Sequence, residues 1–415
     1  MSLYLEEKSK WSLTSTIVLK FTFTYFVLLI LLLFSAMFLE APLRWFAENA
    51  LHWGVDFKMQ STGSGDRSFD FVRLGLNIFL TIIIGSLWSF FGKRKLDYNK
   101  LYYWFKVVLR VFLFTVMILY GLAKVFKGQF ADSKLELLLQ PVGEMSPMGL
   151  AWTFMGHSMA YNIFLGSLEV LGGLLLLNRK TVTLGALVVF GVMINVVLMN
   201  FTYDIPVKLF STNLVLMSLV LLISDRQRII NFLIKNKEVK EKQYVSYIKN
   251  QHLLKVILFL KKAIQLVIVT LVFAQCFIQF KATEQLKSKS ELYGIWESEL
   301  FIKQNDTLPP LLTDSYRWRY LIIDFKNKAS IKKMNDVIDR YSIKENNELK
   351  EITFSKVSNK SSNNFSYSLV GKDKMILKGT LNNEKLYVEF KRIPENSFRL
   401  NNRGFHWVNE TPYNY

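Results

Sequence analysis

The sequence predicts an α-helical polytopic membrane bundle of about seven transmembrane helices, followed by a C-terminal antiparallel β domain that closes as a barrel. Of the 415 residues, 51% are hydrophobic, and they gather in blocks too long for one ordinary soluble domain. Several blocks reach the roughly 20 residues that a helix needs to cross a bilayer. Beyond about residue 284 short alternating segments replace the long apolar runs. We therefore expect a membrane domain over 1–283 and a β domain over 284–415.

The predicted spans are apolar windows of about 19 residues. They lie near residues 20–39, 71–91, 103–126, 160–177, 181–202, 206–224 and 263–280. The first window has an apolar core as long as a span, and the FSAMFLEAP that ends it offers no convincing small-residue cleavage site. We therefore expect an uncleaved span and not a signal peptide.

Lysine and arginine predict the orientation, because cytoplasmic loops of membrane proteins retain positive charge. The basic segments GKRKLDYNK, NRK and DRQRIINFLIKNKEVKEK would all lie on one side, which is then the cytoplasm. Seven spans from a cytoplasmic N-terminus place the C-terminal domain outside. The net charge of +19 is explained by attraction to anionic lipid beside the inner leaflet. No interleaved aromatic and basic pattern suggests nucleic acid, so no nucleic-acid partner is expected.

The composition also limits the chemistry. Cys276 is the only cysteine, which excludes an internal disulfide, a CxxC redox pair and a cysteine-rich metal site. His157 has no second histidine or acid at ligand spacing, so we expect a loop histidine and no metal. The sequence supplies no nucleophile motif and no nucleotide loop. A self-contained enzyme is the least favoured class, and at most the chain is a subunit of a membrane oxidoreductase.

The C-terminal part carries about eight candidate strands. YGIWESELFI, RWRYLIIDF, EITFSK, NFSYSLV, KMILKGT and KLYVEFKRI each suit a strand half buried on one face. Such a set closes into a barrel or packs as a sandwich, since closure removes exposed edges. The GIW near its start is similar to the opening strand of lipocalin-type barrels, and an unrelated small barrel is the alternative.

The loop after the first span has two parts. APLRWFAENALHW has apolar residues at helical spacing, which predicts a helix lying flat at the outer interface. STGSGDRSFD is glycine-rich, but no lysine-serine pair or preceding strand supports a phosphate-binding loop. We expect an extracytoplasmic linker there.

Charged residues inside spans are the strongest site candidates, because each costs roughly 2.5 to 3.5 kcal/mol at mid-bilayer and usually finds a partner. Arg110 in the third span and Glu169 near the centre of the fourth lie at depths that predict a pair, with small residues beside Glu169 permitting close helix approach. A structural ion pair and a functional polar site are the two alternatives.

A second polar group lies nearer the outer surface. Its members would form a funnel open to the outside: Lys124, Lys127, His157, Asn195, Asn200, Asp204 and Lys208. Each also has a structural explanation. Asp204 followed by Ile205 and Pro206 is typical of a helix start, with Asp204 as the N-cap and Lys208 as its ion-pair partner. Lys124 and Lys127 can simply extend to the headgroups.

The run YGLAKVFKGQF, with the run from PVGEMSPMGLAWTFMGHSMAYNIFLGSLEVLGG through NFTYDIPVKLF to LISD, resembles the DoxX-like family of bacterial membrane proteins, particularly its larger members. The likeness covers about residues 101–228 and is most specific in GSLEVLGG and NFTYDIPVKL. GSGDRSFDFV and the ending NRGFHWVNETPYNY are also similar to longer members. The resemblance implies a four-helix core, spans three to six, in the bacterial cytoplasmic (inner) membrane. It marks as family-like the positions Lys124, Glu169, Asn195, Asn200, Asp204 and Lys208.

Some DoxX-like proteins are subunits of a thiosulfate:quinone oxidoreductase, and others are linked to membrane oxidant-resistance complexes. The resemblance thus implies a redox-associated membrane component that holds a quinone or similar amphiphile, with Glu169 and Asn195 as hydrogen-bonding groups and with redox partner subunits. The extra helices and the β domain depart from the small members. Two alternatives therefore stay open: a carrier or binding protein for a small hydrophobic or acidic molecule that works with the outer β domain, and a membrane scaffold for partner proteins.

Overall fold

The computed structural model describes residues 11–35, 39–54, 64–92, 96–131, 134–239, 250–286, 291–325, 327–356, 362–381 and 384–414. Part of FSAMFLEAP and parts of the basic loops lie outside these residues. The chain divides into two compact units, which we describe separately. Unit 1 comprises residues 1–130 and 147–277, and unit 2 comprises residues 131–146 and 278–415. A short segment between two predicted spans thus belongs with the β domain.

Each of the seven apolar windows corresponds to a helix. These are α1 (Leu13–Phe34), α3 (Ser68–Phe91), α4 (Tyr98–Val125), α7 (Met159–Leu177), α8 (Val182–Thr202), α9 (Lys208–Ile223) and α11 (Gln251–Leu286). By length and composition, six described helices can cross a membrane: all of these except α9. The 16-residue α9 reaches that size only together with α10 (Arg226–Leu233), from which it is bent by 78°. The predicted count of seven therefore depends on this bent pair.

Polar caps define several helix starts. The Ser12 hydroxyl accepts the Ser15 amide at the start of α1, Asp97 accepts the amides of Asn99 and Lys100 at the start of α4, and Ser158 caps α7. The helix predicted within APLRWFAENALHW is present as α2 (Glu40–Asn49). These caps satisfy amides that a helix cannot pair internally.

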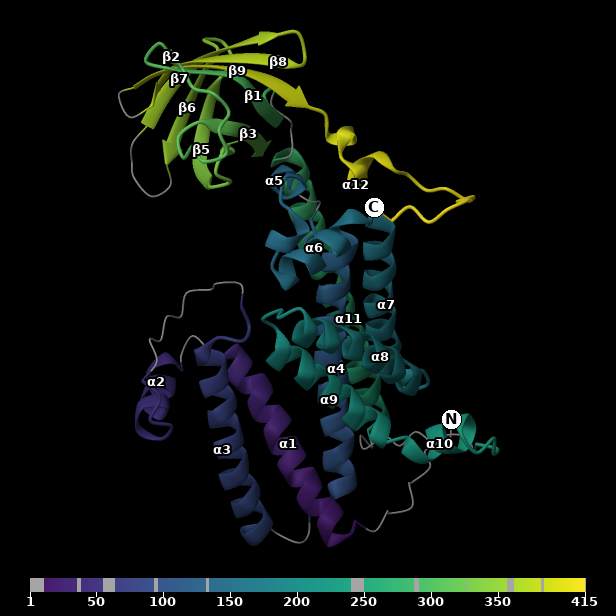
Figure 1. Ribbon diagram of the computed structural model, residues 1–415. Helices are drawn as coiled ribbons and strands as arrows, with labels where there is room; N and C mark the ends of the chain where they lie inside the picture. Colours follow the sequence, from purple (N-terminus) through teal and green to yellow (C-terminus); the bar gives the residue numbers. More distant parts are fainter. Residues whose placement is uncertain are drawn as a thin grey trace. The chain divides into compact units, whose positions relative to one another are not determined.

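Glycines hold α4 against α7. An added Cβ on Gly121 would lie 2.6 Å from the carbonyl oxygen of Gly166, so the two backbones touch there. Gly173 contacts Met117 further along, which shows that the two helices run antiparallel. α7 packs on α8, α8 on α9, and α9 returns to α4. The third to sixth predicted spans thus form a four-helix ring, while α1 and α3 pack side by side (Figure 1).

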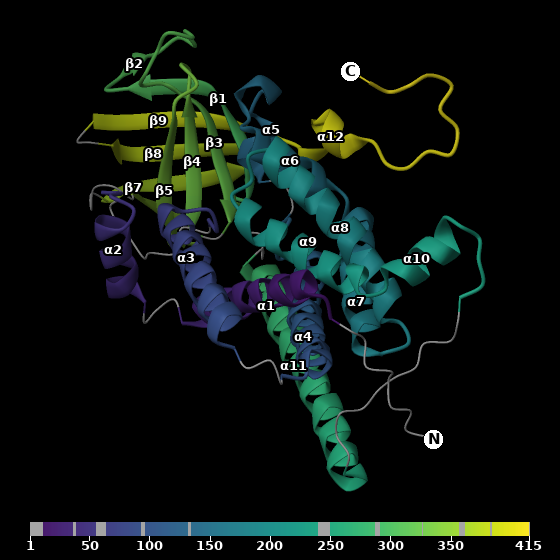
Figure 2. The same ribbon diagram turned by 90° about the horizontal axis from the view of Figure 1, so that it is seen from below.

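Unit 2 contains a closed antiparallel barrel. The described residues form nine strands in one sheet: β1 (Gly294–Lys303), β2 (Asp306–Thr307), β3 (Trp318–Phe325), β4 (Lys328–Lys333), β5 (Ile338–Asn346), β6 (Glu351–Lys356), β7 (Ser362–Val370), β8 (Lys374–Leu381) and β9 (Glu384–Ile393). Their order in the sheet is β2-β1-β3-β4-β5-β6-β7-β8-β9. β2 pairs only with β1, and pairing of β1 with β9 closes the other eight (Figure 2). The predicted barrel is confirmed, and a sandwich is excluded.

Side chains fill the barrel. Its core contains six fully buried aromatic residues: Trp296, Phe301, Trp318, Phe354, Phe365 and Phe390. The tryptophan of the GIW motif donates its indole N–H to the carbonyl oxygen of Leu292 at 2.8 Å, and the Arg392 guanidinium lies 4.3 Å from its ring centroid. An interior of this kind matches the width of an eight-stranded barrel packed with side chains.

The segment 131–146 covers part of the barrel's outer surface. It contains the short helix α5 (Leu135–Leu138) and the 3₁₀ turn η2 (Val142–Glu144). Leu135 is buried against Ile295 of β1 and Ile322 of β3, on the face opposite to the barrel core. Glu136 pairs with Arg340 and accepts a hydrogen bond from the Ser330 hydroxyl. Contacts between residues 194 and 204 positions apart in the chain therefore complete unit 2.

Candidate functional site

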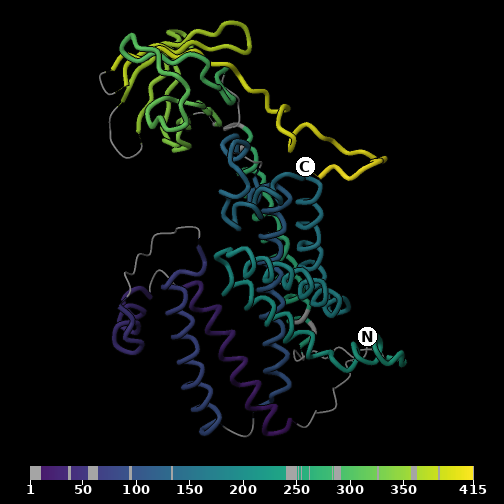
Figure 3. Tube along the Cα trace, in the orientation of Figure 1, coloured from purple at the N-terminus to yellow at the C-terminus, as the bar shows by residue number. Residues whose placement is uncertain are grey.

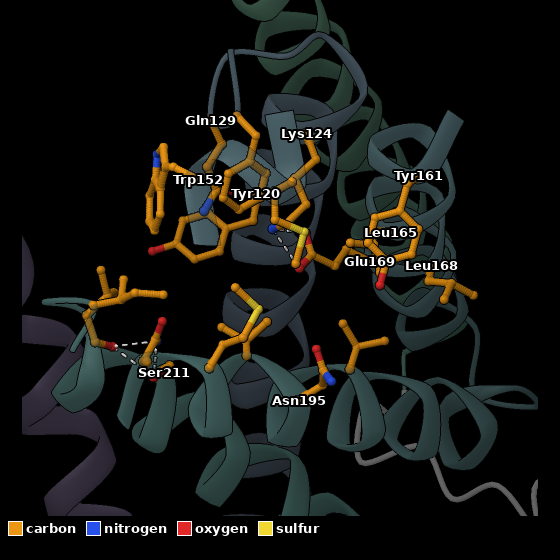
Figure 4. A pocket seen from close by; sticks show the side chains of 18 of the residues that line it. Tyr120, Lys124, Gln129, Trp152, Tyr161, Leu165, Leu168, Glu169, Asn195 and Ser211 are labelled. Atoms are coloured by element: carbon orange, nitrogen blue, oxygen red, sulfur yellow. Dashed lines mark hydrogen bonds and ion pairs between the residues drawn. The ribbon is translucent and has the colours of Figure 1, made fainter. Parts of the chain in front are cut away.

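Unit 1 encloses a cavity of about 460 Å³ between α4, α6 (Pro147–His157), α7, α8 and the start of α9. Figure 4 shows Lys124 and Glu169 on one side of this space, with Asn195 and Ser211 on the other. Aromatic and methionine side chains form much of the wall: Tyr120, Phe130, Met148, Trp152, Met155, Tyr161 and Met199. The lining therefore combines apolar walls with a few polar groups, as in small-molecule sites.

The polar centre of the cavity is an ion pair. The Lys124 Nζ lies 2.9 Å from both carboxylate oxygens of Glu169, and the two residues are only 5% and 1% exposed. The contact of Gly121 with Gly166 brings α4 and α7 close enough for this bidentate geometry. Lys124 also lies 5.7 Å from the Tyr120 ring centroid. Two buried charges thus neutralise each other while facing a space large enough for a ligand.

The expected pairing of Arg110 with Glu169 is wrong. The Arg110 guanidinium donates to the carbonyl oxygens of Leu176 at 2.6 and 2.9 Å and of Leu177 at 3.1 Å. In the antiparallel register of α4 and α7, Arg110 lies beside the C-terminal end of α7, where unpaired carbonyls attract a cation. Lys124, nearly four turns further along α4, is the residue that reaches Glu169.

Asn195 and Asn200 both line the cavity, as the sequence predicts. Asn200 is buried, and its amide donates to the Ser211 hydroxyl at 2.9 Å and to the Val207 carbonyl at 3.3 Å. It therefore links the end of α8 to the start of α9. Asn195 is exposed, and its side chain makes no hydrogen bond within the described part of the chain. Its amide is available to a ligand.

Asp204 and Lys208 do not line the cavity. Their predicted ion pair is confirmed, with Lys208 Nζ 2.7 Å from Asp204 Oδ1 and the Asp204 side chain 87% exposed. The expected N-cap role of Asp204 is wrong, however. Asp204 has a φ of 51°, and the following amide of Ile205 donates to the carbonyl of Asn200, which is the geometry that ends a helix. Asp204 therefore terminates α8, and α9 begins only at Lys208.

The residue that caps α9 is Asp66. Its two carboxylate oxygens accept the backbone amides of Lys208 at 2.7 Å and Leu209 at 3.0 Å. The amide of Gly65 also donates to the Pro206 carbonyl at 2.8 Å. Residues 61–63 of the expected linker lie outside the described residues, and its last three residues belong to α3. Gly65 and Asp66, which lie between them, contact the start of α9. A carboxylate at a helix N-terminus also offsets the helix dipole.

Two further residues of the predicted funnel lie away from the cavity. Lys127 donates to the carbonyl oxygen of Gly156 at 3.0 Å, and His157 is an exposed residue at the end of α6. Among the described residues, no group of three histidine, cysteine or acidic side chains is placed to hold a metal ion.

Comparison with known proteins gives one informative relative. The chain is 40% identical over 119 residues to the uncharacterized protein YwoB of Bacillus subtilis (strain 168), a match that spans 29% of this chain and 75% of YwoB. The chain belongs to the same family as YwoB. No protein-family model matches the chain, and no solved structure matches it. The relative is itself uncharacterized, so this likeness assigns no ligand, partner or activity.

In this member of the YwoB family, sequence reasoning missed the aromatic wall and Asp66. The wall comes from separate elements: Tyr120 from α4, Trp152 from α6 and Tyr161 from α7. An aromatic residue in an apolar run gives no periodic signal that distinguishes a cavity wall from a lipid-facing surface. The sequence GSGDR could have indicated the role of Asp66, because an acidic residue after a glycine-rich turn is typical of a helix cap.

The lining of the cavity in this YwoB relative includes exposed residues. α7 and α8 are held close where Gly172 meets Val188 and Val189 and where Gly185 meets Leu175 and Leu176. The cavity lies toward the other end of these helices, where its lining residues Tyr161, Gly191 and Asn195 are exposed. Gln129, after α4, is also an exposed lining residue. An added Cβ on Gly191 would meet nothing within 4 Å. This exposure indicates an opening between α7 and α8.

Proposed function

We propose that the protein is a DoxX-like component of the bacterial cytoplasmic membrane that binds the head group of a membrane amphiphile between α4, α7 and α8, with a quinone as the favoured ligand. The observation that carries the proposal is the cavity of about 460 Å³ whose polar side is the buried Lys124–Glu169 pair. Cavities of this size hold small organic ligands. Ionisable residues in candidate spans are costly and commonly mark functional sites.

The chemistry of the lining supports a flat, polar head group. Lys124 and Asn195 provide N–H donors, and a quinone ring carries two carbonyl acceptors. The rings of Tyr120, Trp152 and Tyr161 provide faces or edges for an aromatic ligand. A ligand carbonyl near Lys124 Nζ would share the ammonium with Glu169, so binding need not leave either charge unpaired.

A lateral opening supports entry from the lipid phase. The exposed residues around the opening lie on α7 and α8, both of which are candidate spans. A molecule dissolved in the bilayer would reach Lys124 without crossing the membrane surface. A bound quinone would supply the redox chemistry, and the side chains of this chain would bind and orient it. Electron transfer then requires a redox partner subunit.

Two alternatives differ in what supports them. A carrier that passes its cargo into the β domain has less support, because aromatic side chains fill the barrel core. A scaffold is favoured by α11, whose apolar side chains are largely exposed, with Phe259 70%, Leu266 67% and Ile278 66% accessible. Such a helix can face lipid or a partner's helix.

The test is ligand retention by the chain purified in lipid nanodiscs. Extracted small molecules are identified by mass spectrometry, and a quinone analogue is then titrated. Gly191→Leu is expected to close the opening and abolish binding, whereas Gly191→Ala, which adds one methyl group at the same helix position, is expected to retain it. Unchanged thermal melting would show that both variants fold.

The outcomes separate the three hypotheses. Retained quinone that Gly191→Leu loses supports the proposal. A different amphiphile at the same site supports a carrier. Absence of any bound small molecule, together with stable co-purifying proteins, supports the scaffold and overturns ligand binding.

A further inference from the structure

The chain leaves the barrel after β9 as an arm with apolar side chains in solvent. It passes through the 3₁₀ turn η3 (Glu395–Ser397) and the short helix α12 (Arg399–Asn402), and Figure 3 shows the arm in yellow beyond the barrel. Phe405 is 78% exposed, Trp407 91% and Val408 72%. Soluble surfaces rarely present three such side chains together without a binding role.

Contacts within residues 403–413, here called the aromatic loop, hold these side chains at its tip. The Arg403 guanidinium donates to the Asn409 side chain and lies 4.2 Å from the ring centroid of Tyr413. Phe405 and Trp407 meet edge to face with centroids 5.0 Å apart. The loop is thus closed at its base by a cation and presents apolar rings together. These contacts already order the loop before it binds, so binding would cost less conformational entropy.

Unit 2 is covalently joined to the candidate spans through short stretches of chain. β1 begins at Gly294, eight residues after α11 ends at Leu286 (294 minus 286), so this linker spans at most about 29 Å. The chain also passes from unit 1 to unit 2 and back on either side of residues 131–146. A bilayer that holds the candidate spans is therefore an apolar phase to which the domain carrying the aromatic loop is tethered.

We propose that the aromatic loop inserts Phe405, Trp407 and Val408 into the headgroup region of the membrane, as an anchor for the β domain on the predicted outer side. Tryptophan and other aromatic rings are enriched at this depth because an apolar body and a polar edge are both satisfied there. Arg399 and Arg403 at the base of the loop suit anionic headgroups. The surface that the aromatic loop contacts is lipid, not a second protein.

The test measures the depth of the tip in vesicles. The full chain with Cys276→Ser is reconstituted in phosphatidylethanolamine and phosphatidylglycerol vesicles, and a nitroxide label is attached to Phe405→Cys or Val408→Cys. Leu349→Cys, in the turn between β5 and β6 and 66% exposed, is the matched control on the same domain. Insertion predicts loss of access to a water-soluble nickel complex and gain of access to oxygen at the tip, with the reverse at position 349.

Two results would overturn the proposal. Equal access to the nickel complex at positions 405 and 349 would place the tip in water. Shielding from both nickel and oxygen would place it against protein, in a partner or a second copy. A second measurement uses native side chains: brominated lipids should quench more fluorescence in the unlabelled protein than in Trp407→Phe, and equal quenching counts against insertion.

Discussion

The four-helix ring of unit 1 and the barrel of unit 2 are both closed circuits of neighbouring elements, but their interiors differ. The barrel is filled by aromatic rings such as Trp296 and Trp318, each with almost no exposed surface. The helical ring instead keeps a cavity and a buried charge pair. Stability alone favours a filled apolar interior, because voids lose dispersion contacts and buried charges lose hydration. A cavity that retains both features is where a function is expected.

The largest expected effect tests the charge pair. Glu169→Leu or Lys124→Met alone leaves one buried charge unpaired, which should lower the free energy of unfolding by about 3 to 5 kcal/mol. The double variant should recover much of this loss but should not retain ligand, because the polar groups are gone. Thermal melts in nanodiscs and the ligand-retention assay measure the two effects. Full recovery of both in the double variant would reduce the pair to a structural role.

A comparable loss in the free energy of unfolding is expected for a substitution in the barrel core, but with no effect on ligand binding. Trp318→Ala removes a side chain that packs against Phe354, Phe365 and Phe390, and such truncations cost about 3 to 5 kcal/mol. Ligand retention by unit 1 should be unchanged. Near-ultraviolet circular dichroism and limited proteolysis would follow the barrel. Loss of ligand in this variant would contradict the separation of roles between the two interiors.

A smaller effect tests the cap of α9. Asp66→Ala should destabilise unit 1 by about 1 kcal/mol, since two helix amides lose their acceptor. Asp204→Ala is the matched control, because it removes a carboxylate that forms only an exposed ion pair, typically worth about 0 to 1 kcal/mol. Equal destabilisation by the two changes would show that Asp66 does not act as a cap.

The smallest effect is a pH dependence in unit 2. Asp324 lines a cleft of about 300 Å³ beside α5, and burial raises the pKa of its carboxyl, although the hydrogen bond from the Leu135 amide acts in the opposite direction. The folded state therefore binds this proton more tightly than the unfolded state. Protonated Asp324 therefore stabilises the folded state fully at pH values below the pKa of an aspartate in the unfolded chain, about 4. This stabilisation is lost as pH rises through the higher pKa that Asp324 has in the folded protein.

Asp324→Asn should consequently raise the melting temperature of the β domain at pH 7 and have little effect below pH 4, since its side-chain oxygen can still accept from Leu135. Melting curves of both proteins across this range are the measurement. A variant that is less stable at pH 7 would show that the charged carboxylate stabilises the docking of α5.

Local patterns predicted the elements well, whereas pairings between elements were harder to predict. The alternation in segments such as KLYVEFKRI identifies strands because side chains on successive residues face opposite sides. Glu169 was identified as a candidate site residue because it is a charged residue within an apolar span. Its partner was not, because depth does not give the contact register that Gly121 and Gly166 impose. Asp204 was misassigned because proline two residues later suggested a helix start, although its φ of 51° ends the preceding helix.

The covering of the barrel by residues 131–146 has a consequence for the order of folding. Glu136 leaves the ribosome 204 residues before Arg340, its partner, and the strands that receive Leu135 are also made much later. This segment must therefore wait, unpaired, until the strands that it contacts have been synthesised. Contacts so distant in sequence form slowly. A chain that stops before β3 would lack Ile322 and so leave Leu135 without its full docking surface. The exposure of Leu135 would then distinguish unfinished molecules from finished ones for the proteases of the cell.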